Sequence, residues 1–246
     1  MVQAPRRTMV RGPTFIRLLA RLSDVDAPQS NASLSDRLSQ WLDWKHALAL
    51  STALDGKPSA APAEMPTVAS SEEDECARLR ASLAEAIASK PEATVSARRA
   101  TRRASAAEDA DGAVDYTVFR QRYLQLQRTM QAATGNLRGR LRDRLAQQSA
   151  ELARLAEVDA VMELALSPRE QTLLASVPAL LGEHFERLRQ AEQIALADAA
   201  AVETTSTAMP GAWLDVFRKD MQSVLLAELD VRFQPVEGLL AALRTR

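Results

Sequence analysis

The longest periodic stretch of this sequence runs from residue 115 to residue 166, and it restricts the possible folds more than any other feature. Large apolar residues recur along it at steps of three and four, which alternate up to Leu137, and a spacing of this kind places them on one face of a helix. Past Leu137 the pattern takes two steps of four, to Leu141 and Leu145, and then resumes at Leu152. Asp115 stands at its start, and aspartate commonly caps helix N-termini. The apolar stripe consists of Tyr116, Phe119, Tyr123, Leu126, Met130, Ala133, Leu137, Leu141, Leu145, Leu152, Leu155, Val158 and Met162.

An unbroken helix over this stretch would be about 75 Å long, at about 1.5 Å per residue. Such a helix cannot bury its stripe on itself, so it requires other helices of the chain or a partner. We therefore predict one long central helix. Gly135 weakens this prediction, because glycine costs about 1 kcal/mol relative to alanine in a helix interior. The spacing of Gly135 and Gly139 leaves open a kink or a tight helix crossing.

The rest of the chain shows the same helical spacing. Apolar runs of period two are missing, and aromatic residues make up only 4% of the chain. These features predict an all-α protein, an elongated and coiled-coil-like helical bundle with one long central helix and disordered linkers. Composition divides the chain into an N-terminal helical segment (1–55), a linker (56–70), a short helix (71–90), a disordered linker (91–114) and a helical bundle or coiled-coil-like domain (115–246).

The N-terminal segment contains two further helix signals. Pro13 precedes apolar residues at helical spacing, which predicts a short amphipathic helix. We expect this helix to dock on the protein's own core, with contact to anionic lipid as the alternative. Ser33 or Ser35 is expected to cap one helix that ends at Gly56.

Three prolines predict helix boundaries in the second half of the chain. Serine, proline and glutamate in the run Ser167-Pro168-Arg169-Glu170 occupy the N-cap, N1 and N3 positions of a capping box. We therefore expect the long helix to end near Leu166 and the next helix to begin there, after a sharp corner or in an antiparallel hairpin. Pro178 is expected to kink that next helix, and Pro235 to interrupt the last one.

Clusters of arginine contrast with a net charge of only −1. In the long periodic stretch, Arg138 and Arg142 share one helix face, and Arg140 and Arg144 share another. The chain beyond residue 155 leans acidic. We expect the basic and acidic faces to pair within the molecule or in a homo-oligomer. The alternative is that the arginines track the phosphate backbone of a nucleic acid.

The sequence lacks the motifs of common catalytic and cofactor sites. One cysteine and two histidines exclude an internal disulfide and the usual Cys/His zinc sites. The phosphate-binding glycine motifs and H-E-x-x-H do not occur. Cys76 and His184 both lie on apolar stripes of predicted helices, so we expect them to have packing roles. We predict no catalytic residue, no cofactor, no metal and no membrane-spanning segment.

Three stretches carry a family resemblance: RGPTFIRLLARL at residues 11–22, LSQWL at 38–42, and LLAELD at 225–230 with Gln234-Pro235 after it. The chain resembles, over nearly its whole length, a proteobacterial family of helical proteins catalogued as a domain of unknown function. The resemblance implies no activity and no catalytic residues. It also implies a gene neighbourhood. Members of the family are often encoded beside an inner-membrane protein similar to proton-channel stator subunits and a peptidoglycan-binding protein of the outer-membrane-protein-A type.

The long apolar stripe and the lack of site chemistry predict a non-enzymatic helical interaction or scaffold protein. We expect a protein partner or a homo-oligomer, and the resemblance adds an inner-membrane channel-like protein as a partner. The expected location is the cytoplasm, with peripheral attachment to the inner membrane as a variant. A nucleic-acid-binding regulatory protein is the alternative. The candidate interaction residues are Phe119, Tyr123, Leu152, Leu155, Arg138 and Arg142.

Overall fold

A computed structural model of the chain describes residues 14–23, 33–56, 69–89, 114–201 and 211–244. Within these ranges the structure is helical, which confirms the predicted all-α class. The two predicted linkers lie almost entirely outside the described residues. The helices are α1 (Thr14–Ser23), α2 (Leu34–Trp41), α3 (Trp44–Asp55), α4 (Ala69–Ala88), α6 (Tyr116–Gln148), α7 (Ala150–Leu174), α8 (Val177–Ala201) and α9 (Ala212–Arg244).

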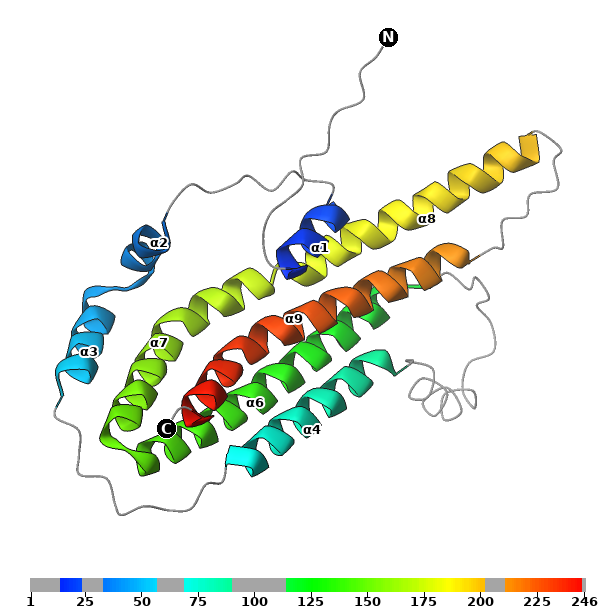
Figure 1. The fold of residues 1–246 in the computed structure, drawn as a ribbon. Coiled ribbons are helices and arrows are strands. Elements are labelled where there is room, and N and C mark those ends of the chain that lie inside the picture. Colours follow the sequence, from blue (N-terminus) through cyan, green and yellow to red (C-terminus); the bar gives the residue numbers. More distant parts are fainter. Residues whose placement is uncertain (1–13, 24–32, 57–68, 90–113, 202–210, 245–246) are drawn as a thin grey trace, which may run out of the picture.

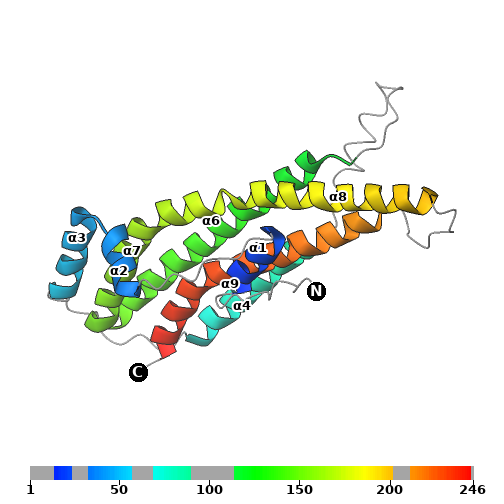
Figure 2. The same cartoon turned by 90° about the horizontal axis from the view of Figure 1, so that it is seen from above.

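The long helices α6 and α9 form the centre of an elongated bundle (Figure 1). Helix α4 packs along both of them, while α7 and α8 follow one another along the opposite side of α6. Helix α1 lies on α8 and α9. Figures 1 and 2 both place α2 and α3 beside α7, at the end of the bundle where α6 and α7 are joined. The predicted elongated bundle with a long central helix is confirmed.

Helix α6 begins as predicted but ends earlier. The side chain of Asp115 accepts a hydrogen bond from the backbone N–H of Thr117, so it is the N-cap. The predicted end near Leu166 is wrong, because Ser149 adopts an extended conformation with φ −154° and ψ 161°. Its side chain accepts a hydrogen bond of 3.2 Å from the N–H of Leu152 and thereby caps α7. The two helices then pack against each other as a hairpin.

The predicted boundaries at Pro168 and Pro235 are also wrong. Helix α7 runs through Pro168 to Leu174, and α9 runs through Pro235 to Arg244. An internal proline removes one helical hydrogen bond, but buried residues on both sides keep each helix packed on the bundle. The kink expected at Pro178 appears as a break at residues 175–176, between the end of α7 at Leu174 and the start of α8 at Val177. Pro178 itself lies in the first turn of α8, where its missing N–H would have no helical partner.

The N-terminal signals are confirmed in part. Phe15 and Leu22 of α1 are buried in the core, so this helix docks on its own chain as expected. Ser33 caps α2 and forms a capping box with Asp36. The prediction of one helix up to Gly56 is wrong, because the helix ends at Trp41 and Asp43 caps a second helix, α3.

Helix α6 also continues through Gly135 without a break. A Cβ atom built on Gly135 or on Gly139 would meet no heavy atom within 4 Å. The two glycines therefore do not mediate a tight helix crossing, and that expectation is wrong. Gly182 differs, because an added Cβ would lie 2.9 Å from Cε1 of Tyr116.

We expect the Gly139→Ala variant to raise the free energy of unfolding by about 0.5–1 kcal/mol, because alanine fits the space and loses less conformational entropy in a helix. Gly182→Ala is the contrasting control and should destabilise the protein, since Tyr116 must move. Urea unfolding followed by circular dichroism would measure both changes. A loss of stability in Gly139→Ala would show that a neighbouring group occupies this space.

Candidate functional site

The arginines of α6 form ion pairs within the molecule. Arg138 donates two hydrogen bonds to the carboxylate of Asp159 on α7, at 2.8 and 2.6 Å. Arg142 donates to Glu163 on the same helix at 2.6 Å. On the other face of α6, Arg144 pairs with Glu72 of α4 at 3.1 Å, and Arg140 pairs with Glu75. The predicted internal pairing of basic and acidic faces is confirmed for these four arginines.

The ion pair with Asp159 changes the pKa of Arg138. Burial opposes the charge of its guanidinium, but the hydrogen bonds and charge of Asp159 outweigh burial and raise the pKa of Arg138 above its usual value. The side chains of Arg138 and Asp159 are only 16% and 15% exposed. This ion pair is therefore screened less by solvent and salt than a surface pair.

A second polar cluster is buried deeper, around Glu228 of α9. This side chain is fully buried. Tyr123 donates its hydroxyl hydrogen to Glu228 Oε2 at 2.6 Å, and Gln127 donates from Nε2 to Oε1 at 3.2 Å. Arg232 donates to Oε1 through both Nε and a terminal nitrogen, at 2.9 and 2.8 Å. Every oxygen of this buried carboxylate therefore has a donor.

The cluster also keeps Tyr123 protonated. Burial raises the pKa of the Tyr123 hydroxyl well above its usual range, and the negative charge of Glu228 adds to the shift. Sequence reasoning assigned no role to Glu228. The available signal was a lone acid inside the apolar run of α9, between Ala227 and Leu229, because an isolated charge in such a run requires a partner when it is buried.

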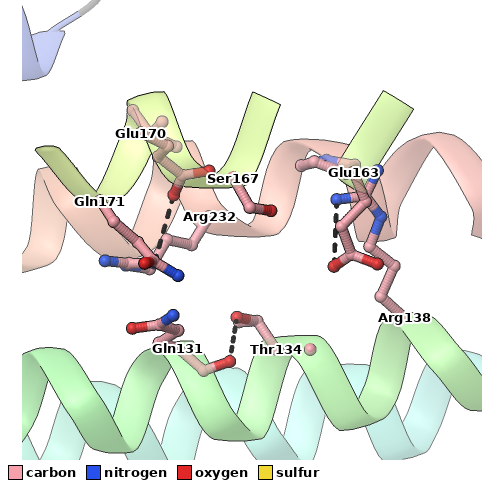
Figure 3. Close-up of a pocket in the computed structure, with 11 residues that line it drawn as sticks. Gln131, Thr134, Arg138, Glu163, Ser167, Glu170, Gln171 and Arg232 are labelled. Carbon is pink, nitrogen blue, oxygen red and sulfur yellow. Dashed lines mark hydrogen bonds and ion pairs between the residues drawn. The ribbon is translucent and has the colours of Figure 1, made fainter. Parts of the chain in front are cut away.

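The two polar clusters border a pocket between α6, α7 and α9 (Figure 3). Its volume is about 200 Å³. Most of the lining residues are polar, and in Figure 3 those of α7 lie opposite those of α6. The lining residues are Gln131, Thr134, Gly135, Arg138, Glu163, Ser167, Glu170, Gln171, Val231, Arg232 and Pro235.

Ion pairs hold the charged residues of this pocket in place. Arg232 bridges Glu228, which lies in the core, and Glu170 on α7, which it contacts at 3.2 Å. Glu163 Oε1 lies 3.5 Å from Arg138. Sequence reasoning did not place these residues together, because it expected the chain to turn at Ser167 rather than to continue past it.

A third feature is the outer face of α3. Trp44, Leu48 and Leu54 are 80%, 57% and 52% exposed. The opposite face of this helix carries the buried Ala53 and packs on α7. Arg154 of α7 donates to the carbonyl oxygen of Gly56 at 3.0 Å and so fixes the end of α3.

Helix α2 is held to α7 by a cation–π contact. The guanidinium carbon of Arg169 lies 4.8 Å from the centre of the Trp41 ring. Such contacts contribute about 0.5–1 kcal/mol at exposed sites. The two short helices are therefore attached to α7 by specific contacts. The exposed side chains of α3 lie on the face turned away from α7.

The structure places the six candidate interaction residues in different environments. Phe119 and Tyr123 are 3% and 0% exposed, so their packing partners are other helices of this chain. Leu152 packs against the core and is partly buried, whereas Leu155 is 40% exposed. Arg138 and Arg142 lie together at the ion pairs with α7. Whether any of the six contacts a partner stays a prediction.

Cys76 and His184 have the packing positions that their spacing predicts. Cys76 is buried in the core, where burial raises the pKa of its thiol and the charge of Glu237 adds to this shift. A thiol that stays protonated is a weak nucleophile. The Nε2 atom of His184 lies 2.8 Å from Asp220 on α9, which also pairs with Arg21 of α1.

Two kinds of feature are absent from the described residues. No three histidine, cysteine, aspartate or glutamate side chains within the described ranges gather closely enough to hold a metal ion. None of the described helices combines the length and apolarity that crossing a membrane requires.

Comparison with known proteins identifies a family but no characterised relative. No curated protein and no solved structure matches the sequence. A family model described as "Protein of unknown function (DUF3348)" matches residues 1–245. Because this match covers nearly the whole chain, the protein belongs to that family.

Proposed function

We propose that this chain is a non-enzymatic helical interaction protein that binds a helix of another protein through the outer face of α3. The observation that carries the proposal is the exposure of Trp44, Leu48 and Leu54 on one short helix. Trp44 and Leu48 are four residues apart and therefore lie on adjacent turns of one face. Exposed apolar clusters of this kind often mark protein interaction sites, and tryptophan is enriched among residues that dominate binding energy.

The chemistry of this surface favours a partner helix. Helix α3 already uses one face to pack on α7, and its free face offers the i, i+4 apolar spacing that packs against an amphipathic helix. The family resemblance suggests an inner-membrane channel-like protein as the partner, with this chain on the cytoplasmic side. The nucleic-acid alternative has less support, because Arg138, Arg140, Arg142 and Arg144 already hold carboxylates of this chain.

Affinity capture from the native cell, with gently solubilised membranes and added nuclease, tests the proposal. We expect the wild-type chain to retain a protein that the Trp44→Ser/Leu48→Ser double variant loses. Leu164→Ser is the matched control, because Leu164 is 68% exposed on α7 and lies outside α3. Both variants should keep wild-type stability to within about 0.5 kcal/mol per substitution, since exposed sites contribute little.

The outcome is decided by comparing the three chains. A protein retained by the wild type and by Leu164→Ser, but lost by the double variant, supports the proposal. Retention of the same protein by the double variant overturns it. Recovery of this chain alone, with self-association that the double variant abolishes, would make the outer face of α3 an interface between copies and would equally overturn it.

A further inference from the structure

Charged contacts hold the first turns of α4 on the bundle. Three acids in these turns each pair with an arginine of α6 or α9, and the pairs are Glu72 with Arg144, Glu75 with Arg140, and Glu73 with Arg244. Glu72 is buried, whereas both members of the other two pairs are partly exposed to solvent. Salt screens exposed ion pairs more than buried ones. We therefore expect the attachment of this end of α4 to weaken as the salt concentration rises.

Two further arginines hold the middle and the end of α4. Arg80 pairs with Asp230 and Glu237 of α9, at 2.6 and 2.5 Å. Its guanidinium carbon lies 5.5 Å from the centre of the Phe233 ring. Arg122 of α6 donates hydrogen bonds to backbone carbonyl oxygens at the last turn of α4. The polar contacts of α4 therefore extend from its first turns to its last.

Apolar anchoring of α4 is limited in comparison. Among the side chains that the structure describes on this helix, the buried apolar ones are those of Cys76, Leu83 and Ile87. Helix α9, in contrast, carries buried apolar residues from Phe217 to Leu243. Segments that bury little apolar surface open at a lower free energy than the core of the same protein. Helix α4 is therefore expected to open before α6 and α9 separate from each other.

The connections of α4 differ from those of α7. Helix α7 follows α6 directly at Ser149 and leads into α8 after residues 175–176. Residues 57–68 precede α4 and residues 90–113 follow it, and the composition of both segments predicts linkers. No described helix continues directly into or out of α4. Separation of α4 would therefore leave the joints between α6, α7 and α8 unchanged.

We propose that α4 is a removable strap, which separates from the bundle as a unit when its ion pairs are weakened and uncovers the face of α6 and α9 on which it lies (Figure 1). This face contains Phe233, which lies under Arg80 and is fully buried while α4 is in place. The charged partners of α4 flank this ring, so the uncovered face is both apolar and charged. The strap controls access to this face, which is separate from the outer face of α3.

The thiol of Cys76 reports the opening of α4 in the full chain. Cys76 is the single cysteine of the sequence and is buried, so a thiol reagent reaches it only when the helix opens. N-ethylmaleimide is a suitable reagent because it carries no charge. The rate of modification is divided by the rate for the urea-unfolded chain at the same salt concentration, which removes any effect of salt on the thiol itself.

We expect salt to accelerate the modification of Cys76. Raising sodium chloride from about 0.1 M to about 1 M shortens the Debye length from about 10 to about 3 Å and should increase the rate about fivefold or more. Low concentrations of urea should scarcely change the rate, because opening of α4 exposes far less surface than global unfolding. Urea unfolding followed by circular dichroism supplies the urea dependence of global unfolding for comparison.

Two variants of α6 test the role of the ion pairs. Arg140→Gln combined with Arg144→Gln should speed modification about fivefold or more at low salt and reduce the effect of salt, since two pairs with α4 are lost. Arg142→Gln is the matched control, because Arg142 pairs with Glu163 of α7, and its rate should stay within about twofold of the wild type. Circular dichroism verifies that both variants fold.

Three results would each overturn the proposal. The first is a rate of Cys76 modification that salt leaves unchanged or lowers in the wild type. The second is a rate that follows the urea dependence of global unfolding, which would show that α4 leaves only when the whole bundle unfolds. The third is a double variant that reacts no faster than Arg142→Gln, which would show that the ion pairs do not hold α4 in place.

Discussion

The Glu228→Ala variant is expected to lose about 3–5 kcal/mol of unfolding free energy, a large part of the stability of a typical domain. The loss arises mainly from the groups that remain. Arg232 has a side chain only 6% exposed, and its strongest partner would be gone. The hydroxyl of Tyr123 would lose an acceptor at 2.6 Å in the core. An unpaired buried charge costs more than the pair contributes.

Urea unfolding of the wild type and of three variants separates these contributions. Tyr123→Phe should cost about 1.5–3 kcal/mol, the range for a hydrogen bond to a charged group. Glu228→Met combined with Arg232→Met should recover most of the loss of Glu228→Ala, because a packed apolar pair can replace a buried ion pair at little cost. A loss below about 1 kcal/mol in Glu228→Ala would show that water reaches this carboxylate in the folded protein.

The all-α class could be predicted from the local sequence, because each long helix shows its own apolar spacing. Asp115 caps α6 as expected, and the apolar residues from Phe119 to Leu145 are buried at helical spacing. The hairpin at Ser149 could not be predicted from the same pattern. Leu145 and Leu152 are seven residues apart, a step that also continues an uninterrupted stripe, so the turn leaves no mark in the periodicity.

The strongest sequence signal for a helix boundary, at Ser167, does not end a helix in the structure, and the reason is tertiary packing. The run from Ser167 to Glu170 satisfies the rules for a helix start, yet Ala165 and Leu174 on either side are buried within α7. Pro168 deprives the carbonyl of Leu164 of its donor, but Leu164 is 68% exposed, so water can replace the lost hydrogen bond. Packing on both sides of the proline thus outweighs a local preference for ending the helix.

The candidate sites were less predictable than the fold. The pocket forms where Gly135 of α6, Ser167 of α7 and Pro235 of α9 come together. How these three helices align depends on where the chain turns. The exposed face of α3 needs the break at Asp43, which gives this helix its own direction. In contrast, the pairing of Arg138 with α7 required only that the acidic residues beyond position 155 fold back on α6.

The Phe217→Ala variant is expected to lose about 3–5 kcal/mol of unfolding free energy, the range for removing a fully buried aromatic side chain. Phe217 of α9 is fully buried. Its ring stands edge-on to Phe185 of α8, with 5.0 Å between centroids, and edge-on to Phe119 of α6, at 5.2 Å. The ring therefore joins three helices, and alanine would leave a cavity between all of them.

The same cluster supplies the controls. Phe217→Leu keeps most of the apolar volume and should cost less than Phe217→Ala, because the remaining loss is limited to shape and to the aromatic contacts, about 0.5–1.5 kcal/mol each. Val216→Ala changes the neighbouring residue, which is 46% exposed, and should shift the stability by no more than about 0.5 kcal/mol. Urea unfolding followed by circular dichroism measures all three. Equal losses in Phe217→Ala and Phe217→Leu would show that stability depends on aromatic geometry at this junction rather than on the volume that the ring fills.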